Sequence, residues 1–261
     1  MIKAVFFDID GTLISFRNHL VPASTLLALN ALREKGIKIF IATGRAYNNL
    51  GYLHKVIPIE FDGYITVNGQ YCVCGKKVVH EQVLPTEDIK NFIPYLDKND
   101  IASVFVELDY RYINRYNERI ERERKILGAT LESEPIDSTD RIFSHKTYQL
   151  CAYIHGDEED EALKYLPNCR AVRWHSEFAD IIPKEGGKDV GIRKMLEHFN
   201  FCAEESMAFG DGGNDIEMLN AAGIGVAMGN ANEALKAVAD YVTDDVDNDG
   251  ILNALKHFKI I

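Results

Sequence analysis

The sequence predicts an α/β fold, a doubly wound parallel sheet that carries an inserted α+β domain. At both ends of the 261-residue chain, buried strands alternate with helices, which is the pattern of a parallel sheet covered by helices. The middle of the chain has a different rhythm, with strands close together and charged helices between them. We therefore expect a core domain formed by residues 1–80 and 183–261 and an insert over residues 81–182.

The first part of the core is predicted from apolar runs and their spacing. Residues 2–9 and 37–42 are nearly continuous apolar runs, typical of strands buried on both faces. Leucines at helical spacing predict a helix over 22–35, which Gly36 ends. A second helix is expected over 46–56. Asn68-Gly69, between two short apolar runs, predicts a hairpin turn.

The same reading covers the insert and the second part of the core. In the insert we expect helices over 86–98, 117–127 and 157–166, and strands over 102–108, 148–154, 171–174 and 178–182. In the core we expect strands over 206–209, 224–228 and 241–242, and helices over 189–199, from about 214, over 232–239 and over 251–258.

Charge and cysteine content restrict the partners and the compartment. Lys and Arg total 29 against 40 Asp and Glu, so the net charge is −11 and most of the surface would repel a nucleic acid. The five cysteines are an odd number and form no CxxC pair, as expected for reduced thiols. No apolar run approaches membrane-spanning length, and no secretion signal is visible. We expect a cytoplasmic protein that binds neither nucleic acid nor membrane.

Two carboxylates end the first predicted strand. Asp8 and Asp10 lie two residues apart, so their side chains would point the same way if the strand continued. Asp10-Gly11 alone could be an ordinary turn. That interpretation leaves Asp8 unexplained, because an unpaired charge at the end of an apolar strand is costly to bury. The pair therefore predicts a site that supplies a cation or a proton.

Two further segments follow buried strands, where the loops of a parallel sheet meet at a ligand crevice. Thr43-Gly44-Arg45 offers a hydroxyl, free amides and a guanidinium, which suit a phosphate. Residues 210–215 read Gly-Asp-Gly-Gly-Asn-Asp, and their oxygens suit a hard cation such as Mg²⁺. Each segment alone could be a plain turn, but together they predict a phosphate site beside a metal site.

These motifs together resemble the haloacid dehalogenase superfamily of phosphohydrolases. The residues that carry the resemblance, in chain order, are Asp8, Asp10, Thr43, Lys188, Asp211 and Asp215. The position, size and α+β rhythm of the insert resemble the type IIB cap of the Cof-like branch, which includes bacterial hexose-phosphate phosphatases. The resemblance implies a Mg²⁺-dependent phosphatase that hydrolyses small phosphorylated metabolites, sugar phosphates first.

The resemblance also implies roles for individual residues. Asp8 would be the nucleophile that forms an aspartyl-phosphate, and Asp10 the general acid and base. Mg²⁺ would be held by the carboxylates of Asp8 and Asp211 and by the backbone carbonyl of Asp10. Asp215 would be a further ligand or would contact the ligands without touching the metal. The groups that would bind the phosphoryl oxygens lie in three segments of the chain: Thr43, Gly44, Arg45, Lys188 and Asn214.

Four alternatives stay open at this point. Relatives commonly show a Lys-Gly pair, so Lys184 competes with Lys188 for the phosphate; we choose Lys188 because it starts a predicted helix, whose positive end favours an anion. A phosphomutase of the phosphomannomutase type would use the same core and cap. A binding protein without activity is the third possibility, although every chemical position is filled. The substrate is not specified by these patterns, and a non-sugar cofactor phosphate is an alternative to a sugar phosphate.

Overall fold

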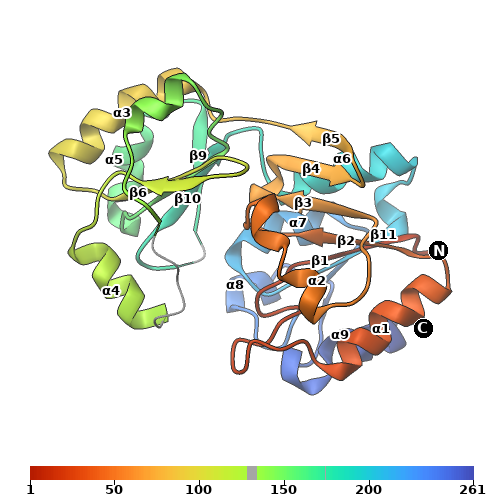
Figure 1. The fold of residues 1–261 in the computed structure, drawn as a ribbon. Coiled ribbons are helices and arrows are strands. Elements are labelled where there is room, and N and C mark those ends of the chain that lie inside the picture. Colours follow the sequence, from red (N-terminus) through yellow and green to blue (C-terminus); the bar gives the residue numbers. More distant parts are fainter. Residues whose placement is uncertain (128–133, 174) are drawn as a thin grey trace. The chain divides into compact units, whose positions relative to one another are not determined.

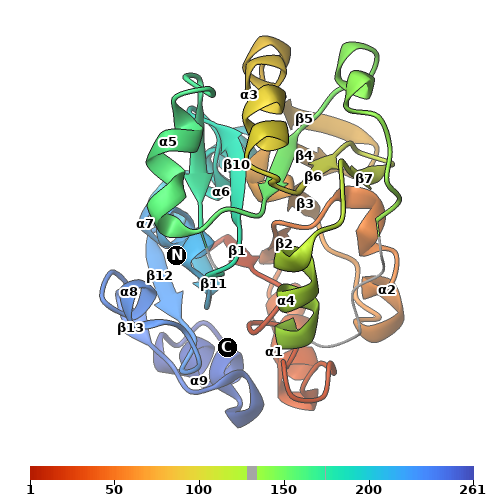
Figure 2. The same cartoon turned by 90° about the vertical axis from the view of Figure 1, so that its left-hand side faces the viewer.

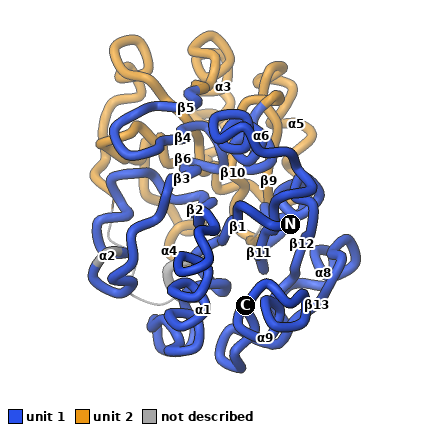
Figure 3. The backbone as a smooth tube through the Cα atoms, turned by 90° about the vertical axis from the view of Figure 1, so that its right-hand side faces the viewer, with its two compact units in different colours: residues 1–81, 186–261 blue, residues 82–185 orange. Residues whose placement is uncertain are grey.

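Residues 1–127, 134–173 and 175–261 are described by a computed structural model of the chain, and they divide into two units (Figure 3). Unit 1 contains residues 1–81 and 186–261, and unit 2 contains residues 82–185. The sequence placed these divisions after residues 80 and 182. The second division lies later because the last strand of unit 2 runs to Pro183.

Unit 1 is built on an eight-stranded sheet with the order β13-β12-β11-β1-β2-β3-β4-β5, whose strands are labelled in Figure 2. The pairs from β13 to β3 are parallel, whereas β4 pairs antiparallel with β3 and β5 antiparallel with β4. The strands are β1 (Ala4–Phe7), β2 (Lys38–Ala42), β3 (Gly63–Thr66), β4 (Tyr71–Cys74), β5 (Lys77–Glu81), β11 (Ser206–Gly210), β12 (Ile224–Ala227) and β13 (Tyr241–Val242).

Helices cover both faces of this sheet, as the apolar runs predicted. They are α1 (Ala23–Glu34), α2 (Leu53–Val56), α6 (Lys188–Phe199), α7 (Ile216–Ala221), α8 (Glu233–Lys236) and α9 (Gly250–His257). Because side chains alternate along a strand, Val5 and Phe7 of β1 pack in the cluster with α1 and α9, whereas Ala4 and Phe6 pack in the cluster with α6 and α7. The two helix layers lie on opposite sides of the sheet in Figures 1 and 2.

Unit 2 is built on an antiparallel sheet. Its strand order is β7-β6-β8-β10-β9. The elements are α3 (Thr86–Lys98), β6 (Ser103–Val106), β7 (Arg111–Ile113), α4 (Glu118–Leu127), β8 (Gln149–Ala152), α5 (Glu159–Leu163), β9 (Cys169–Val172) and β10 (Ala179–Pro183). Residues of α3, α5 and alternate strand positions form one apolar cluster, so this unit has a core of its own.

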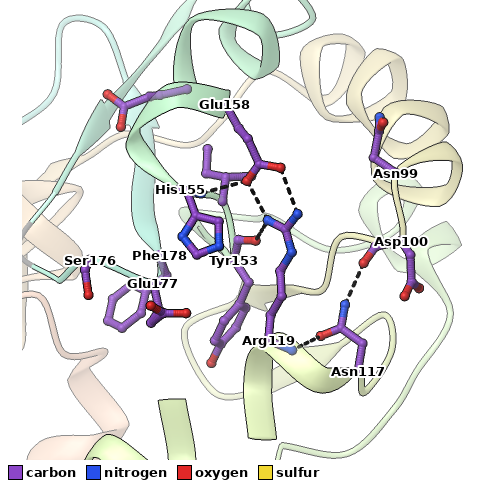
Figure 4. Close-up of polar contacts among 12 residues, drawn as sticks. Asn99, Asp100, Asn117, Arg119, Tyr153, His155, Glu158, Ser176, Glu177 and Phe178 are labelled. Atoms are coloured by element: carbon purple, nitrogen blue, oxygen red, sulfur yellow. Dashed lines mark hydrogen bonds and ion pairs between the residues drawn. The ribbon is translucent and has the colours of Figure 1, made fainter. Parts of the chain in front are cut away.

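An ion pair ties α4 to the start of α5 (Figure 4). Arg119 donates to both carboxylate oxygens of Glu158, at 2.5 and 2.7 Å, and to the carbonyl of Tyr153 at 2.9 Å. Glu158 also accepts from the backbone amide of His155. The two-point contact of the guanidinium with a partly buried carboxylate fixes direction as well as distance, so it helps to orient α4 within unit 2.

The fold class is confirmed, while several predicted elements need correction. The helix expected over 46–56 is wrong: a 3₁₀ turn, Tyr47–Leu50, and the four-residue α2 stand there, with Gly51 between them. The helices expected over 157–166 and 232–239 are shorter in the structure, as α5 and α8. The sequence missed β5 and β7. The strand predicted over 171–174 ends at Val172 as β9, and Trp174 lies outside the described residues. No helix among residues 1–127, 134–173 and 175–261 is long and apolar enough to cross a bilayer.

Candidate active site

The predicted site residues of unit 1 come together at the carboxyl ends of three neighbouring strands. Asp8 follows β1, Thr43 follows β2 and Asp211 follows β11, and β1 lies between the other two in the sheet. The backbone amide of Asp8 continues the ladder by donating to the carbonyl of Phe209 at 3.0 Å. Because all three strands are parallel, their following loops lie along one edge, where ligands bind in open α/β sheets.

A buried lysine connects two of the carboxylates. Nζ of Lys188 lies 2.6 Å from Oδ1 of Asp8 and 2.6 Å from Oδ1 of Asp215. The side chains of Lys188 and Asp215 have no exposed surface. Burial alone would lower the pKa of Lys188, but the charges of Asp215 and Asp8 outweigh it and raise that pKa. Lys188 is therefore a fixed positive charge at the first residue of α6.

Three carboxylates form a cluster that one ammonium group does not neutralise. Asp8, Asp211 and Asp215 each offer an oxygen within 4.8 Å of the others. Burial, reinforced by the neighbouring carboxylates, raises the pKa of Asp8 to about 7 and that of Asp211 to about 9. Oxygen ligands held this close, with more negative than positive charge, are the donor set that a hard divalent cation prefers.

The three carboxylates differ in how far their oxygens are already bound. Asp215 uses both oxygens, since Oδ1 accepts from Lys188 and Oδ2 accepts from the amides of Asp211 and Gly212 at 3.0 and 2.9 Å. Asp211 accepts one bond, from the hydroxyl of Thr12 at 2.9 Å. Asp215 thus orients the loop and the lysine, whereas Asp8 and Asp211 have more capacity left for a cation.

Asp10 has a different partner, Arg45 of the segment Thr43-Gly44-Arg45. Nε and Nη2 of Arg45 donate to the two carboxylate oxygens of Asp10 at 2.8 and 2.7 Å. The guanidinium also lies over the ring of Tyr52, 5.2 Å from its centroid. Both charged side chains are more than a third exposed, so this pair is open to solvent, unlike Asp8.

The segment Thr43-Gly44-Arg45 and the segment 210–215 meet through a residue that the sequence assigned to a turn. Thr43 is buried, and its hydroxyl accepts from the amide of Arg45 at 3.2 Å. Nδ2 of Asn214 donates to Oδ1 of Asn68 at 3.1 Å. A Cβ added to Gly44 would lie 3.3 Å from both polar atoms of the same amide group. Asn68 thus lies between two predicted phosphate-binding segments.

Sequence reasoning missed Asn68, Thr12 and the partner of Arg45, and one signal was available. Asn68 follows β3, a further parallel strand beside β2, so the rule that located Thr43 also applied to it. The competing lysine, Lys184, lies in unit 2, where it is exposed and donates to the carbonyl of Pro167 at 3.0 Å. The other predicted residues all lie in unit 1.

Comparison with known proteins agrees with this geometry. The family model for haloacid dehalogenase-like hydrolases matches residues 5–255. The solved structure of a subclass IIB sugar phosphatase, BT4131, is 43% identical, covers 99% of this chain and 100% of its own, and has a TM-score of 0.89.

Two curated relatives from Bacillus subtilis (strain 168) span nearly the whole chain. YkrA, which is assigned as a phosphatase, is 33% identical over 99% of this chain and 98% of its own length. The 5-amino-6-(5-phospho-D-ribitylamino)uracil phosphatase YitU is 26% identical over 97% of this chain and 96% of its own.

The chain belongs to the haloacid dehalogenase-like hydrolase family. Within it, the chain is a Cof-like phosphatase, a phosphoric monoester hydrolase, as the order of its motifs predicted.

Proposed function

We propose that the protein is a Mg²⁺-dependent phosphatase of small phosphorylated metabolites, sugar phosphates first, and that it works through an aspartyl-phosphate on Asp8. One observation carries the proposal. The buried carboxylate of Asp8 lies 2.6 Å from the ammonium of Lys188, within a cluster of acidic oxygens and two residues before the more exposed Asp10. In a protein of net charge −11, a dianionic phosphate needs local positive charge, which Lys188 and a metal ion held by these carboxylates would supply.

The reaction is proposed in two steps. In the first, an oxygen of Asp8 forms a bond to phosphorus while the bond to the leaving oxygen breaks and Asp10 gives that oxygen a proton. In the second, Asp10 takes a proton from water, whose oxygen bonds to phosphorus as the acyl-phosphate bond breaks. Inorganic phosphate leaves, and both carboxylates return to their starting states.

The remaining groups would bind the three oxygens that carry the charge of the transferring phosphoryl group. Lys188, Thr43, the amide of Gly44 and Asn214 are proposed for this role. Arg45 was expected here as well, and its two-point contact with Asp10 supports a second role, in which it directs the general acid and base.

The acidic cluster fits a Mg²⁺ ion. Asp8, Asp211 and the backbone carbonyl of Asp10 would hold it, with Asp215 as a further ligand or as the residue that orients the others. Without a metal, the pKa values of Asp8 and Asp211 are raised, so both carboxylates lack a compensating positive charge. A divalent cation would supply that charge and favour their ionised forms. When bound, the ion would neutralise charge on the phosphoryl oxygens.

The proposed substrate class is supported by the relatives. The subclass IIB sugar phosphatase shares 43% identity with the chain, whereas YitU, a phosphatase of a ribityl-aminouracil phosphate, shares 26%. Sugar phosphates are therefore the first class to test, and non-sugar cofactor phosphates the second. The five cysteines, none of which is in a disulfide, support a reducing, cytoplasmic location.

Phosphate release from a metabolite panel tests the proposal. With Mg²⁺, and without any added bisphosphate, a hexose or pentose phosphate should give the highest kcat/KM, and excess EDTA should abolish turnover. Transfer of phosphate to a second sugar hydroxyl without net release would indicate the phosphomutase instead. Full turnover in EDTA, with metal shown absent by elemental analysis, would contradict the role of the cluster.

A further inference from the structure

The turn after β3 has a backbone that a hairpin does not require. Val67, Asn68 and Gly69 have φ values of 52°, 52° and 96°. The loop has four residues, 67–70, between the paired Thr66 and Tyr71, and within it Asn68 and Gly69 are of the two types that adopt the left-handed conformation readily. Val67 is a third left-handed residue, and a β-branched residue there costs on the order of 1–3 kcal/mol. Such strain persists only where surrounding contacts impose it.

The contacts that impose it come from the predicted phosphate-binding segment. The amide of Val67 donates to the carbonyl of Arg45 at 2.9 Å, and the amide of Asn68 donates to the carbonyl of Thr43 at 3.0 Å. The turn therefore holds the residues on both sides of Gly44. Because both bonds join backbone to backbone, they set the direction of the Gly44 amide and the place of Thr43 without depending on a side-chain rotamer.

The same turn fixes the start of α6. Gly69 packs so closely on Gly187 that an added Cβ would lie 1.9 Å from the Gly187 carbonyl oxygen and 3.1 Å from the amide nitrogen of Lys188. The position of the buried ammonium of Lys188 thus depends on this turn as well.

The side chain of Asn68 extends the contact to the metal-binding segment. It is 1% exposed, and its Oδ1 accepts from Nδ2 of Asn214 at 3.1 Å. Its amide group also occupies the space beside Gly44, since a Cβ added there would lie 3.3 Å from its oxygen and its nitrogen. The turn therefore touches three segments that are far apart in sequence, those of Thr43, Lys188 and Asn214.

We propose that Asn68 is a positioning residue for phosphoryl transfer, which holds the amide of Asn214 at the distance and direction it needs toward the phosphoryl oxygens. This inference rests on the proposed function. Because Asn68 acts through Asn214, its loss should affect the transition state more than substrate binding, and so kcat more than KM.

Asn68→Gly tests the inference, since glycine retains the left-handed backbone and removes only the side chain. With the sugar phosphate that the wild type hydrolyses fastest, kcat should fall about tenfold to a hundredfold, the loss expected when one catalytic contact is misplaced. KM should change less than about threefold. In an Asn214→Ala background the same substitution should lower kcat less than about threefold, because the residues act as one unit.

Gln70→Ala is the matched control in the same turn. Gln70 is fully buried, and its Nε2 donates to the carbonyl of Asn68 at 3.1 Å. It should lower Tm as much as Asn68→Gly does while leaving kcat within about threefold of wild type. Equal losses of kcat in both variants would show that the turn contributes only stability, and would overturn the inference.

Asn68→Asp is the second variant, for the case that Asn68→Gly does not fold. Aspartate has nearly the side-chain volume of asparagine, tolerates the left-handed backbone and retains an oxygen that accepts from Asn214. Its kcat should stay within about tenfold of wild type, while its added charge should raise KM for the dianionic substrate. A loss of kcat as large as that of Asn214→Ala would overturn the inference, as would full activity of folded Asn68→Gly or additive effects in the double variant. A wild type that hydrolyses no phosphorylated compound would overturn the proposed function itself.

Discussion

Replacement of Lys188 by methionine should destabilise unit 1 and nearly abolish turnover. The ammonium lies 2.6 Å from each of two carboxylates, and its side chain has no exposed surface. Removing one partner of a buried ion pair costs about 3–5 kcal/mol, because a buried charge is left uncompensated. For a domain of this size, that corresponds to a Tm lower by roughly 6–20 °C.

The loss should depend on pH in a defined direction. The folded-state pKa of Asp8 is already raised to about 7, and removal of Lys188 would raise it further. A carboxyl group with a raised folded-state pKa is protonated more in the native state than in the unfolded state, so stability falls as pH rises through that pKa. Lys188→Met should therefore lose more stability at about pH 8.5 than at about pH 5.5.

Urea unfolding followed by circular dichroism, in EDTA and at both pH values, measures this effect. Lys184→Met is the control, because Lys184 is exposed and its Nζ donates to the carbonyl of Pro167 in unit 2. With Mg²⁺, kcat should fall about a hundredfold to a thousandfold for Lys188→Met and less than about tenfold for Lys184→Met. If Lys188→Met stays within about 0.5 kcal/mol of wild type at both pH values, the ion-pair reasoning is refuted. The reverse order of the two kcat values would assign the phosphate to Lys184.

Three further predictions concern the metal, Asp10 and the insert. Mg²⁺ should raise Tm, and by more at about pH 8.5 than at about pH 5.5. The reason is that the pKa of Asp8, about 7, and that of Asp211, about 9, make the metal-free cluster lose stability as pH rises. Scanning calorimetry measures both shifts, and a larger rise in Tm at the lower pH would contradict the prediction. Arg45→Lys should lower kcat tenfold to a hundredfold, since lysine cannot hold both oxygens of Asp10, and an unchanged kcat would remove its orienting role. Exchange of residues 82–185 for those of another family member should change the ranking of substrates by kcat/KM, because the proposed catalytic residues lie in unit 1; a ranking that follows unit 1 would contradict this.

The sheet of unit 1 was predictable because burial leaves a strong pattern. Residues 2–9 and 37–42 are nearly continuous apolar runs, and β1 and β2 lie within them. By contrast, β5 is an edge strand whose residues are mostly exposed, so Lys77–Glu81 shows no such run. The helix expected over 46–56 had apolar spacing, but Gly51 interrupts it and weakens a helix interior.

The sequence predicted which loops meet at the site, but it did not predict which side chains bind one another there. The rule for the carboxyl ends of parallel strands found Asp8, Thr43 and Asp211. It gives no side-chain directions, so Arg45 was expected at the phosphate, whereas it binds Asp10 in the structure. Asn68 was hidden because Asn-Gly between apolar runs satisfies a local rule for hairpins completely, and only the packed structure shows its contact with Asn214.

Trapping the phosphorylated enzyme tests the central proposal most directly. Wild-type protein and Asp8→Asn would be mixed with a radiolabelled sugar phosphate in Mg²⁺, quenched in acid within one turnover, and assayed for label bound to protein. An aspartyl-phosphate predicts label on the wild type that hydroxylamine removes, and none on Asp8→Asn with an unchanged melting curve. Equal labelling of folded Asp8→Asn, or rapid phosphate release with no label on the wild type, would contradict the proposal that Asp8 is the nucleophile.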